Sequence, residues 1–147
     1  MRILLATDGS EYSEAAVEKL ARHPFPADSE VLVLSVFEPP PFPFTVPGGG
    51  VNFDAQIQET AEKAVERAAT RLQTGEESRK LQITTNVLAG SPKRVIVEEA
   101  EAFGADLIVV GSRGLGAWDR LLLGSVSQAV ATHAKCSVVI VRSRVVK

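Results

Sequence analysis

Short apolar segments that alternate with helix-like stretches constrain this chain more than any other feature of its sequence. Buried strands are predicted at residues 3–6, 31–37, 83–89, 107–110 and 138–141. Apolar residues at helical spacing lie between successive strands, at 13–20, 54–72, 92–103 and 126–133. Apolar strands separated by helices are typical of a parallel sheet covered on both faces. With right-handed crossovers, the sequence predicts a three-layer α/β sandwich of the Rossmann-like kind.

The expected sheet has five parallel strands in the order 3-2-1-4-5. Segment 83–89 alternates partly between apolar and polar residues, which favours a place at the sheet edge. Ligands of such sheets bind beyond the carboxyl ends of the strands, where the strand order reverses. That switch point lies between the first and fourth strands. The 147 residues fit one domain, so we expect a single domain over residues 1–147.

Some residues mark where helices and loops are expected. Ser10 and Asp54 are predicted N-caps, and Ser91 is predicted to cap a helix that begins at Pro92. Residues 38–50 hold five of the chain's eight prolines and are expected to form a loop within the domain.

Composition and charge argue against several classes of function. The formal net charge of −2 disfavours broad binding to nucleic acid or to an acidic membrane. A single cysteine, Cys136, allows no intrachain disulfide and disfavours a cysteine-based metal site. No apolar run approaches the roughly 18 residues of a membrane span, and the N-terminal apolar stretch is too short for a signal peptide. We therefore expect a cytoplasmic protein with no metal site and no nucleic-acid or membrane partner.

Two loops are expected to meet at the switch point. One comprises residues 7–10 after the first strand, and the other comprises residues 111–116 and 124–127 after the fourth. Glycines permit positive φ and close approach of a ligand, and the N-terminus of a helix suits a phosphate. The glycines could instead only end a strand and begin a helix, but four of them at a switch point favour a phosphate site. The side chains expected to add hydroxyl donors or positive charge are Ser125, Ser127, Arg113 and Arg120.

The spacing Gly111-x2-Gly114-x9-Gly124-Ser125 is the most specific motif of the chain. It resembles the G-x2-G-x9-G-[ST] motif of the nucleotide-binding branch of the universal stress protein family. The string GSRGLGAWDRLLLGSVSQAV, the D-G-S after the first strand and the closing CSVVIVR resemble the same family. The resemblance therefore covers the whole chain.

This resemblance implies an ATP-binding protein of stress response or signalling, which takes ATP with or without Mg²⁺. Asp8 would contact the adenine side, and the backbone at Val36 would contact the base. The glycine segment and Ser125 would hold the ribose and the phosphates. The implied nucleotide-binding residues are Ala6, Thr7, Asp8, Val36, Val110, Gly111, Arg113, Gly114, Gly124, Ser125, Val126 and Ser127.

No catalytic residue is identified in the sequence. The chain has no G-x-x-x-x-G-K-[ST] loop, and Gln128 stands where a G-x-S-x-G elbow needs its second glycine. His133 is interpreted as a packed or half-exposed helix residue and Cys136 as a small apolar filler. Without a clear general base, we expect at most weak ATPase or autophosphorylation activity.

Two other classes of function stay open at this point. A flavodoxin-like redox carrier would use the same sheet, but one Trp and one Tyr leave little to stack on a flavin. A dimeric interaction module would use the same fold and bind no nucleotide.

The last strand, within residues 137–142, is predicted to form a homodimer interface. It lies at a sheet edge in the order 3-2-1-4-5, and no proline or charge interrupts its apolar residues 138–141. An open apolar edge invites aggregation unless it is paired or covered, and pairing with a second copy gives a closed two-fold interface. The family resemblance implies the same dimer. The alternative is a monomer whose edge is covered by residues 144–147.

Overall fold

The structure is a computed structural model that describes residues 1–39, 53–114 and 123–143. The expectations for Arg120, for most of the 38–50 loop and for the 144–147 tail lie outside these residues. In the described part, no helix is both long enough and apolar enough to cross a membrane.

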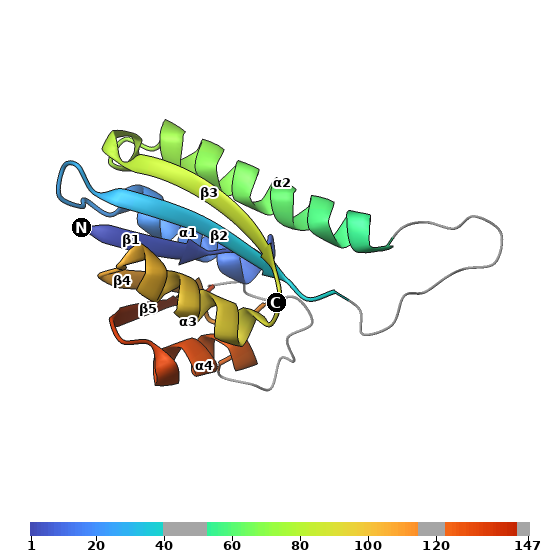
Figure 1. Cartoon of the computed structure of the whole chain (residues 1–147). Coiled ribbons are helices and arrows are strands. Elements are labelled where there is room, and N and C mark those ends of the chain that lie inside the picture. Colours follow the sequence, from blue (N-terminus) through green and yellow to red (C-terminus); the bar gives the residue numbers. More distant parts are fainter. Residues whose placement is uncertain (40–52, 115–122, 144–147) are drawn as a thin grey trace, which may run out of the picture.

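Five parallel strands form one sheet in the order β3-β2-β1-β4-β5, which confirms the predicted topology (Figure 1). The strands are β1 (Arg2–Ala6), β2 (Glu30–Phe37), β3 (Gln82–Ala89), β4 (Leu107–Gly111) and β5 (Ser137–Val141). The order places β3 and β5 at the two edges, as the sequence predicts.

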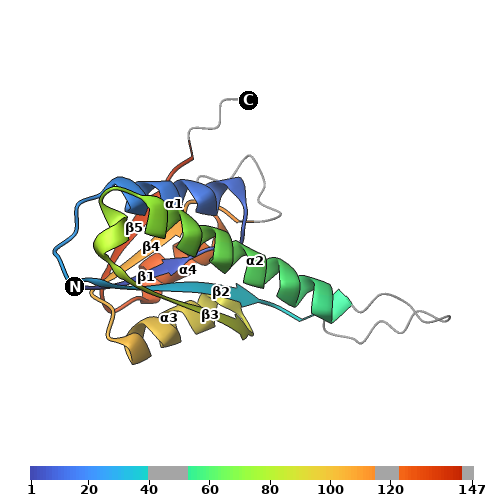
Figure 2. The same cartoon turned by 90° about the horizontal axis from the view of Figure 1, so that it is seen from above.

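Four α-helices cover the sheet: α1 (Glu11–Arg22), α2 (Phe53–Thr74), α3 (Pro92–Phe103) and α4 (Ser125–His133). Helices α1 and α2 lie on one face, and α3 lies on the other (Figure 2). Residues of α4 pack with those of α3 in the same apolar cluster, so α4 shares that face. A short 3₁₀ helix, η1 (Ser78–Lys80), lies between α2 and β3 and was not expected from the sequence.

The core consists of two apolar layers, one on each face of the sheet. Alternate residues of a strand point to opposite faces. Ile3 and Leu5 therefore pack under α1 and α2, whereas Leu4 packs under α3 and α4. All three are fully buried, which is why the strands read as continuous apolar runs.

The helix starts agree with the prediction at two of three positions. Ser10 caps α1, and its hydroxyl accepts a hydrogen bond from the amide of Ser13. Ser91 holds the cap position of α3 and the helix begins at Pro92, as predicted, although the Ser91 side chain makes no capping bond. Helix α2 already begins at Phe53, so Asp54 lies inside the helix and the predicted N-cap is wrong.

Candidate functional site

A cavity of about 630 Å³ lies at the carboxyl ends of β1, β2 and β4. All twelve residues proposed from the sequence line it. They come from segments far apart in the chain, and the sheet order brings those segments together at the switch point.

Part of the cavity wall was missed by the sequence analysis. Helix α2 contributes Ile57, Thr60 and Ala61, none of which was proposed from the sequence. The missed lining residues from the other elements are Ser13, Leu34, Ser35, Phe37, Glu38, Pro92 and Ile96. Only the packing of α2 and α3 over the sheet reveals these residues, because no local motif marks them.

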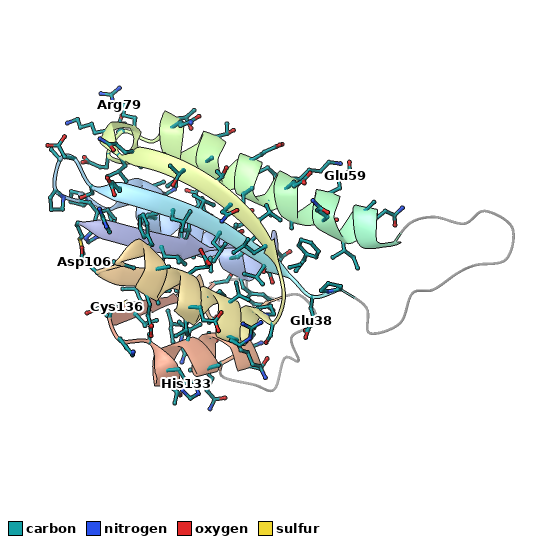
Figure 3. The ribbon with its side chains drawn as sticks, viewed as in Figure 1. Glu38, Glu59, Arg79, Asp106, His133 and Cys136 are labelled. Atoms are coloured by element: carbon teal, nitrogen blue, oxygen red, sulfur yellow. The ribbon has the colours of Figure 1, made fainter. Side chains whose placement is uncertain are left out.

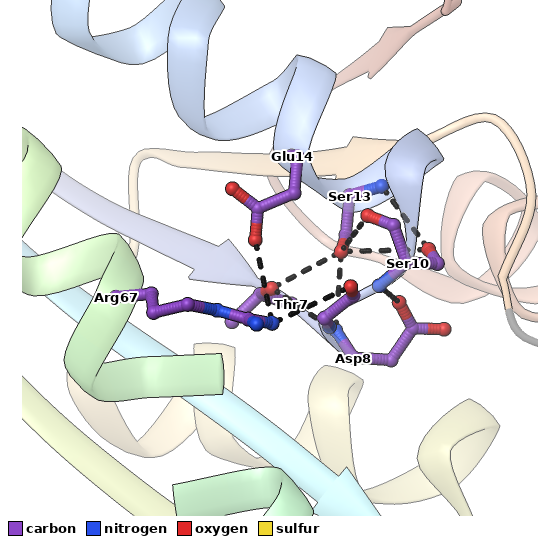
Figure 4. A network of polar contacts seen from close by, with 7 residues as sticks. Thr7, Asp8, Ser10, Ser13, Glu14 and Arg67 are labelled. Carbon is purple, nitrogen blue, oxygen red and sulfur yellow. Dashed lines mark hydrogen bonds and ion pairs between the residues drawn. The ribbon is translucent and has the colours of Figure 1, made fainter. Parts of the chain in front are cut away.

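A network of hydroxyl groups shapes the loop between β1 and α1 (Figure 4). The Ser13 hydroxyl donates to the backbone oxygen of Ser10 at 3.0 Å. The Ser13 hydroxyl also lies 3.1 Å from the Thr7 hydroxyl, and either group can be the donor of that bond. The Thr7 oxygen in turn accepts from the Gly9 amide at 3.3 Å. Thr7 and Ser13 therefore fix the conformation of the loop.

Asp8 joins the two loops that form the site. One carboxylate oxygen accepts the Ser10 amide at 2.9 Å, so Asp8 stabilises the turn in addition to lining the cavity. The other oxygen lies against Gly114, where an added Cβ would come within 2.6 Å of Oδ2. The missing side chain of Gly114 thus admits the carboxylate of Asp8.

Hydrogen bonds to the backbone oxygen of Ser112 join the two ends of the second loop, which we call its neck. This oxygen accepts the Gly124 amide at 2.6 Å and the Ser127 hydroxyl at 2.9 Å. The Ser127 hydroxyl also lies 3.0 Å from the Gly124 oxygen and is buried. The Ser127 hydroxyl therefore contacts backbone oxygens in this structure, and its expected role as a donor to a phosphate stays a prediction. Ser125, at the start of α4, is exposed.

The glycines of the second loop serve close packing. None of Gly111, Gly114 and Gly124 has a positive φ, so that part of the expectation is wrong at these three positions, and close approach of a ligand stays a prediction. A Cβ on Gly111 would lie 2.5 Å from the backbone oxygen of Tyr12, and one on Gly124 would lie 3.1 Å from the Cα of Arg113. These glycines bring α1, β4 and the start of α4 together.

The start of α4 is the electropositive part of the cavity. The amides of Ser125, Val126 and Ser127 belong to the first helical turn, where no intrahelical acceptor is available. The guanidinium of Arg113 stacks on the ring of Tyr12, 5.8 Å from its centroid. Among the described lining residues, Arg113 is the single cation, and Asp8 and Glu38 are the carboxylates.

Cys136 and His133 lie away from the cavity (Figure 3). Cys136 precedes β5 at the amino ends of the strands, while the cavity lies at their carboxyl ends. It is half-buried in the apolar layer under α3 and α4, and burial raises the pKa of its thiol. This agrees with its interpretation as an apolar filler. The described residues include no group of three or more metal-ligating side chains.

The fold and the cavity define a parallel α/β protein with a cavity at the switch point of its sheet, where ligands of such sheets bind. The chain belongs to the universal stress protein family, whose model matches residues 1–142. A universal stress protein of Methanocaldococcus jannaschii is 33% identical over 141 residues, which is 96% of this chain and 81% of the relative.

Two solved structures of the same family share the fold. A universal stress protein in complex with cAMP is 26% identical, with a TM-score of 0.62 over 97% of this chain and 96% of that chain. A family protein from Arabidopsis thaliana with AMP bound is 20% identical, with a TM-score of 0.70 over 99% and 93%.

Proposed function

We propose that this protein binds an adenine nucleotide in the cavity at the switch point, with ATP as the first candidate. The observation that carries the proposal is that all twelve candidate residues line one cavity. Its volume of about 630 Å³ is in the range of small-molecule and cofactor sites. The family members with AMP and cAMP bound support an adenine nucleotide as the ligand.

In the proposed orientation, the base lies at the end of β2 and the phosphates lie at the start of α4. Val36 and Leu34 of β2, with Ile96 of α3, offer apolar surface for the base. The free amides at the start of α4 suit a phosphate, and the Ser125 hydroxyl is the side-chain donor beside them. Arg113 would leave Tyr12 to reach the phosphates, and Mg²⁺ carried in with ATP would offset further charge.

The proposed role is binding and sensing of the nucleotide, with slow turnover at most. The described lining residues include no histidine or lysine, and Asp8 already accepts a backbone hydrogen bond. No lining group is therefore set up as a strong base for an attacking water. We further propose that the protein acts in the cytoplasm in stress response or signalling.

A homodimer through β5 is part of the proposal. The strand forms the outer edge of the sheet, and Val139 on it is 39% exposed, which is high for a large apolar residue of a strand. Pairing of this edge with a second copy would cover Val139 and satisfy the open backbone groups.

Mass spectrometry of the small molecule that co-purifies with the protein tests the proposed ligand. An adenine nucleotide in near-stoichiometric amount is the expected result. A flavin would instead favour the redox carrier. A protein that purifies empty and binds no added nucleotide would favour the interaction module.

A further inference from the structure

Arg67 of α2 contacts the turn that carries Asp8. Its Nη2 donates a hydrogen bond to the backbone oxygen of Gly9 at 3.5 Å. Figure 4 shows the side chain reaching from α2 to the turn between β1 and α1. Neither Arg67 nor Gly9 lines the cavity of the proposed ligand. Arg67 can therefore act on a ligand there through the turn or through its charge, but not by contact.

One face of α2 serves both the cavity and this turn. Thr60 lines the cavity, and Ala64 and Arg67 follow it at the spacing of one helix face. Ala64 is fully buried, and a Cβ on Gly9 would lie 3.4 Å from the Cβ of Ala64 and 2.9 Å from Nη2 of Arg67. The turn thus packs closely on α2, and this packing holds Arg67 beside the Gly9 oxygen.

Arg67 and Asp8 bind opposite ends of one peptide group. The Gly9 oxygen that Arg67 contacts and the Ser10 amide that donates to Asp8 Oδ1 at 2.9 Å belong to the same peptide bond. A trans peptide is planar, so its C=O and N–H point in opposite directions. Glycine leaves such a peptide freer to rotate than another residue would. Fixing the Gly9 oxygen therefore fixes the direction of the Ser10 amide and, with it, the Asp8 carboxylate.

Glu14 of α1 attracts the guanidinium to the turn. Among the residues that the structure describes, its Oε1 is the one buried side-chain polar atom without a hydrogen-bond partner. Nη2 of Arg67 lies 3.9 Å from it, which is close enough for an ion pair but too far for a hydrogen bond. A buried carboxylate oxygen requires a nearby cation. Glu14 thus holds Arg67 in place, while the hydrogen bond of Nη2 goes to Gly9.

We propose that Arg67 is a positioning residue that orients the Asp8 carboxylate toward the ligand through the peptide between Gly9 and Ser10. Its effect on binding rests on the proposed function, whereas its effect on the turn is a property of the protein without ligand. The side chain of Arg67 is 61% exposed, so its contacts add little to global stability. Its contribution is the direction of one carboxylate.

The variant Arg67→Ala tests the proposal, with Arg71→Ala as a matched control. Arg71 lies one helical turn further along α2 and pairs with Glu18 of α1 instead of the turn. Hydrogen exchange of the Ser10 amide is followed by NMR without ligand, and the affinities for AMP and adenosine are measured by calorimetry. Arg67→Ala should speed the exchange of Ser10 several-fold and weaken the binding of both compounds about fivefold, with little change in melting temperature. Arg71→Ala should melt lower, with the Ser10 exchange and both affinities within about twofold of the unmodified protein.

Three results would overturn the assignment. Unchanged exchange of Ser10 in Arg67→Ala would show that Arg67 does not hold the peptide. Unchanged affinity for both compounds would show that the ligand does not depend on this contact. A loss for AMP alone would make Arg67 a positive charge that acts on the phosphate, since adenosine carries none. If the unmodified protein binds neither compound, the proposed function fails, and the exchange of Ser10 still tests the hold of Arg67 on the turn.

Discussion

At the scale of single residues, the site depends on close contact between its two loops. Gly114 and Asp8 belong to different loops, and the missing Cβ of one makes room for the carboxylate of the other. The G-x2-G-x9-G spacing resembles a ligand motif, yet in the described loop each of its glycines also faces protein atoms. We expect a substitution at Gly114 to affect ligand binding through Asp8 of the neighbouring loop.

The variant Gly114→Ala tests this contact. Its Cβ would lie 2.6 Å from Asp8 Oδ2, so the carboxylate must move. We expect the affinity for an adenine nucleotide to fall at least tenfold, about 1.4 kcal/mol, with the fold retained. In an Asp8→Ala background the same substitution should cost little more, because neighbouring sites couple. Titration calorimetry measures the loss of binding free energy in each variant. If the loss in the double variant equals the sum of the two single losses, Gly114 does not act through Asp8.

Ser127 tests the second loop at the same scale. Ser127→Ala removes the hydroxyl that donates to the Ser112 oxygen at 2.9 Å. We expect a loss of stability of about 1 kcal/mol and weaker nucleotide binding, since the loop neck loosens. Ser125→Ala is the control, because its hydroxyl is exposed and its loss should weaken nucleotide binding without a change in melting temperature. Thermal denaturation measures both variants. If Ser127→Ala has the same melting temperature as Ser125→Ala and the unmodified protein, this role of Ser127 is contradicted.

At the scale of elements, α2 connects the cavity wall to its neighbour α1 on the same face of the sheet. Its first half lines the cavity, and its second half pairs with α1, where Arg71 contacts Glu18 with two nitrogens. The hydrogen bond from Arg71 lowers the pKa of Glu18 below its ordinary value of 4.5. The pair lies across two helices, so it orients α2 on the sheet.

This pair predicts a pH dependence of stability. A lowered pKa in the folded state means that the ionised carboxylate of Glu18 favours folding. Its contribution is fully present above pH 4.5 and is lost as the pH falls through the lowered pKa. Glu18→Gln should therefore melt at a slightly lower temperature at neutral pH, since the pair is partly exposed. The difference should disappear in acid. A difference that stays constant from neutral to acidic pH would contradict the assignment.

The sequence predicts the elements better than their contacts. The strands could be predicted because apolar periodicity is a local property of the sequence. Their order could be predicted because the handedness rule for crossovers holds for parallel sheets in general. The candidate residues near Gly111 and Gly124 could be predicted because a spaced motif marks them. The α2 wall and the contact of Arg67 with Gly9 could not, since both depend on which helix packs over the ends of β1 and β2. The pair of Arg71 and Glu18 depends on helix packing in the same way.

At the scale of the whole molecule, the open β5 edge predicts a homodimer. Val139 is 39% exposed on a strand with one unpaired side. Light scattering at micromolar concentration should give twice the mass of one 15.7 kDa chain. Val139→Pro removes a backbone donor and should give a monomer or aggregates. A clean monomer mass for the unmodified protein would defeat the prediction.

The central claim is that the cavity at the switch point binds an adenine nucleotide. Titration calorimetry of the purified protein, freed of any co-purifying ligand, with ATP, AMP and cAMP and with GTP as the comparison tests it most directly. We predict saturable one-to-one binding of at least one adenine nucleotide per chain, at least tenfold tighter than GTP, and weakened by Gly114→Ala. Two results would contradict the account. One is no heat of binding with any adenine nucleotide, and the other is that the unmodified protein and Gly114→Ala each bind GTP as tightly as the adenine nucleotides.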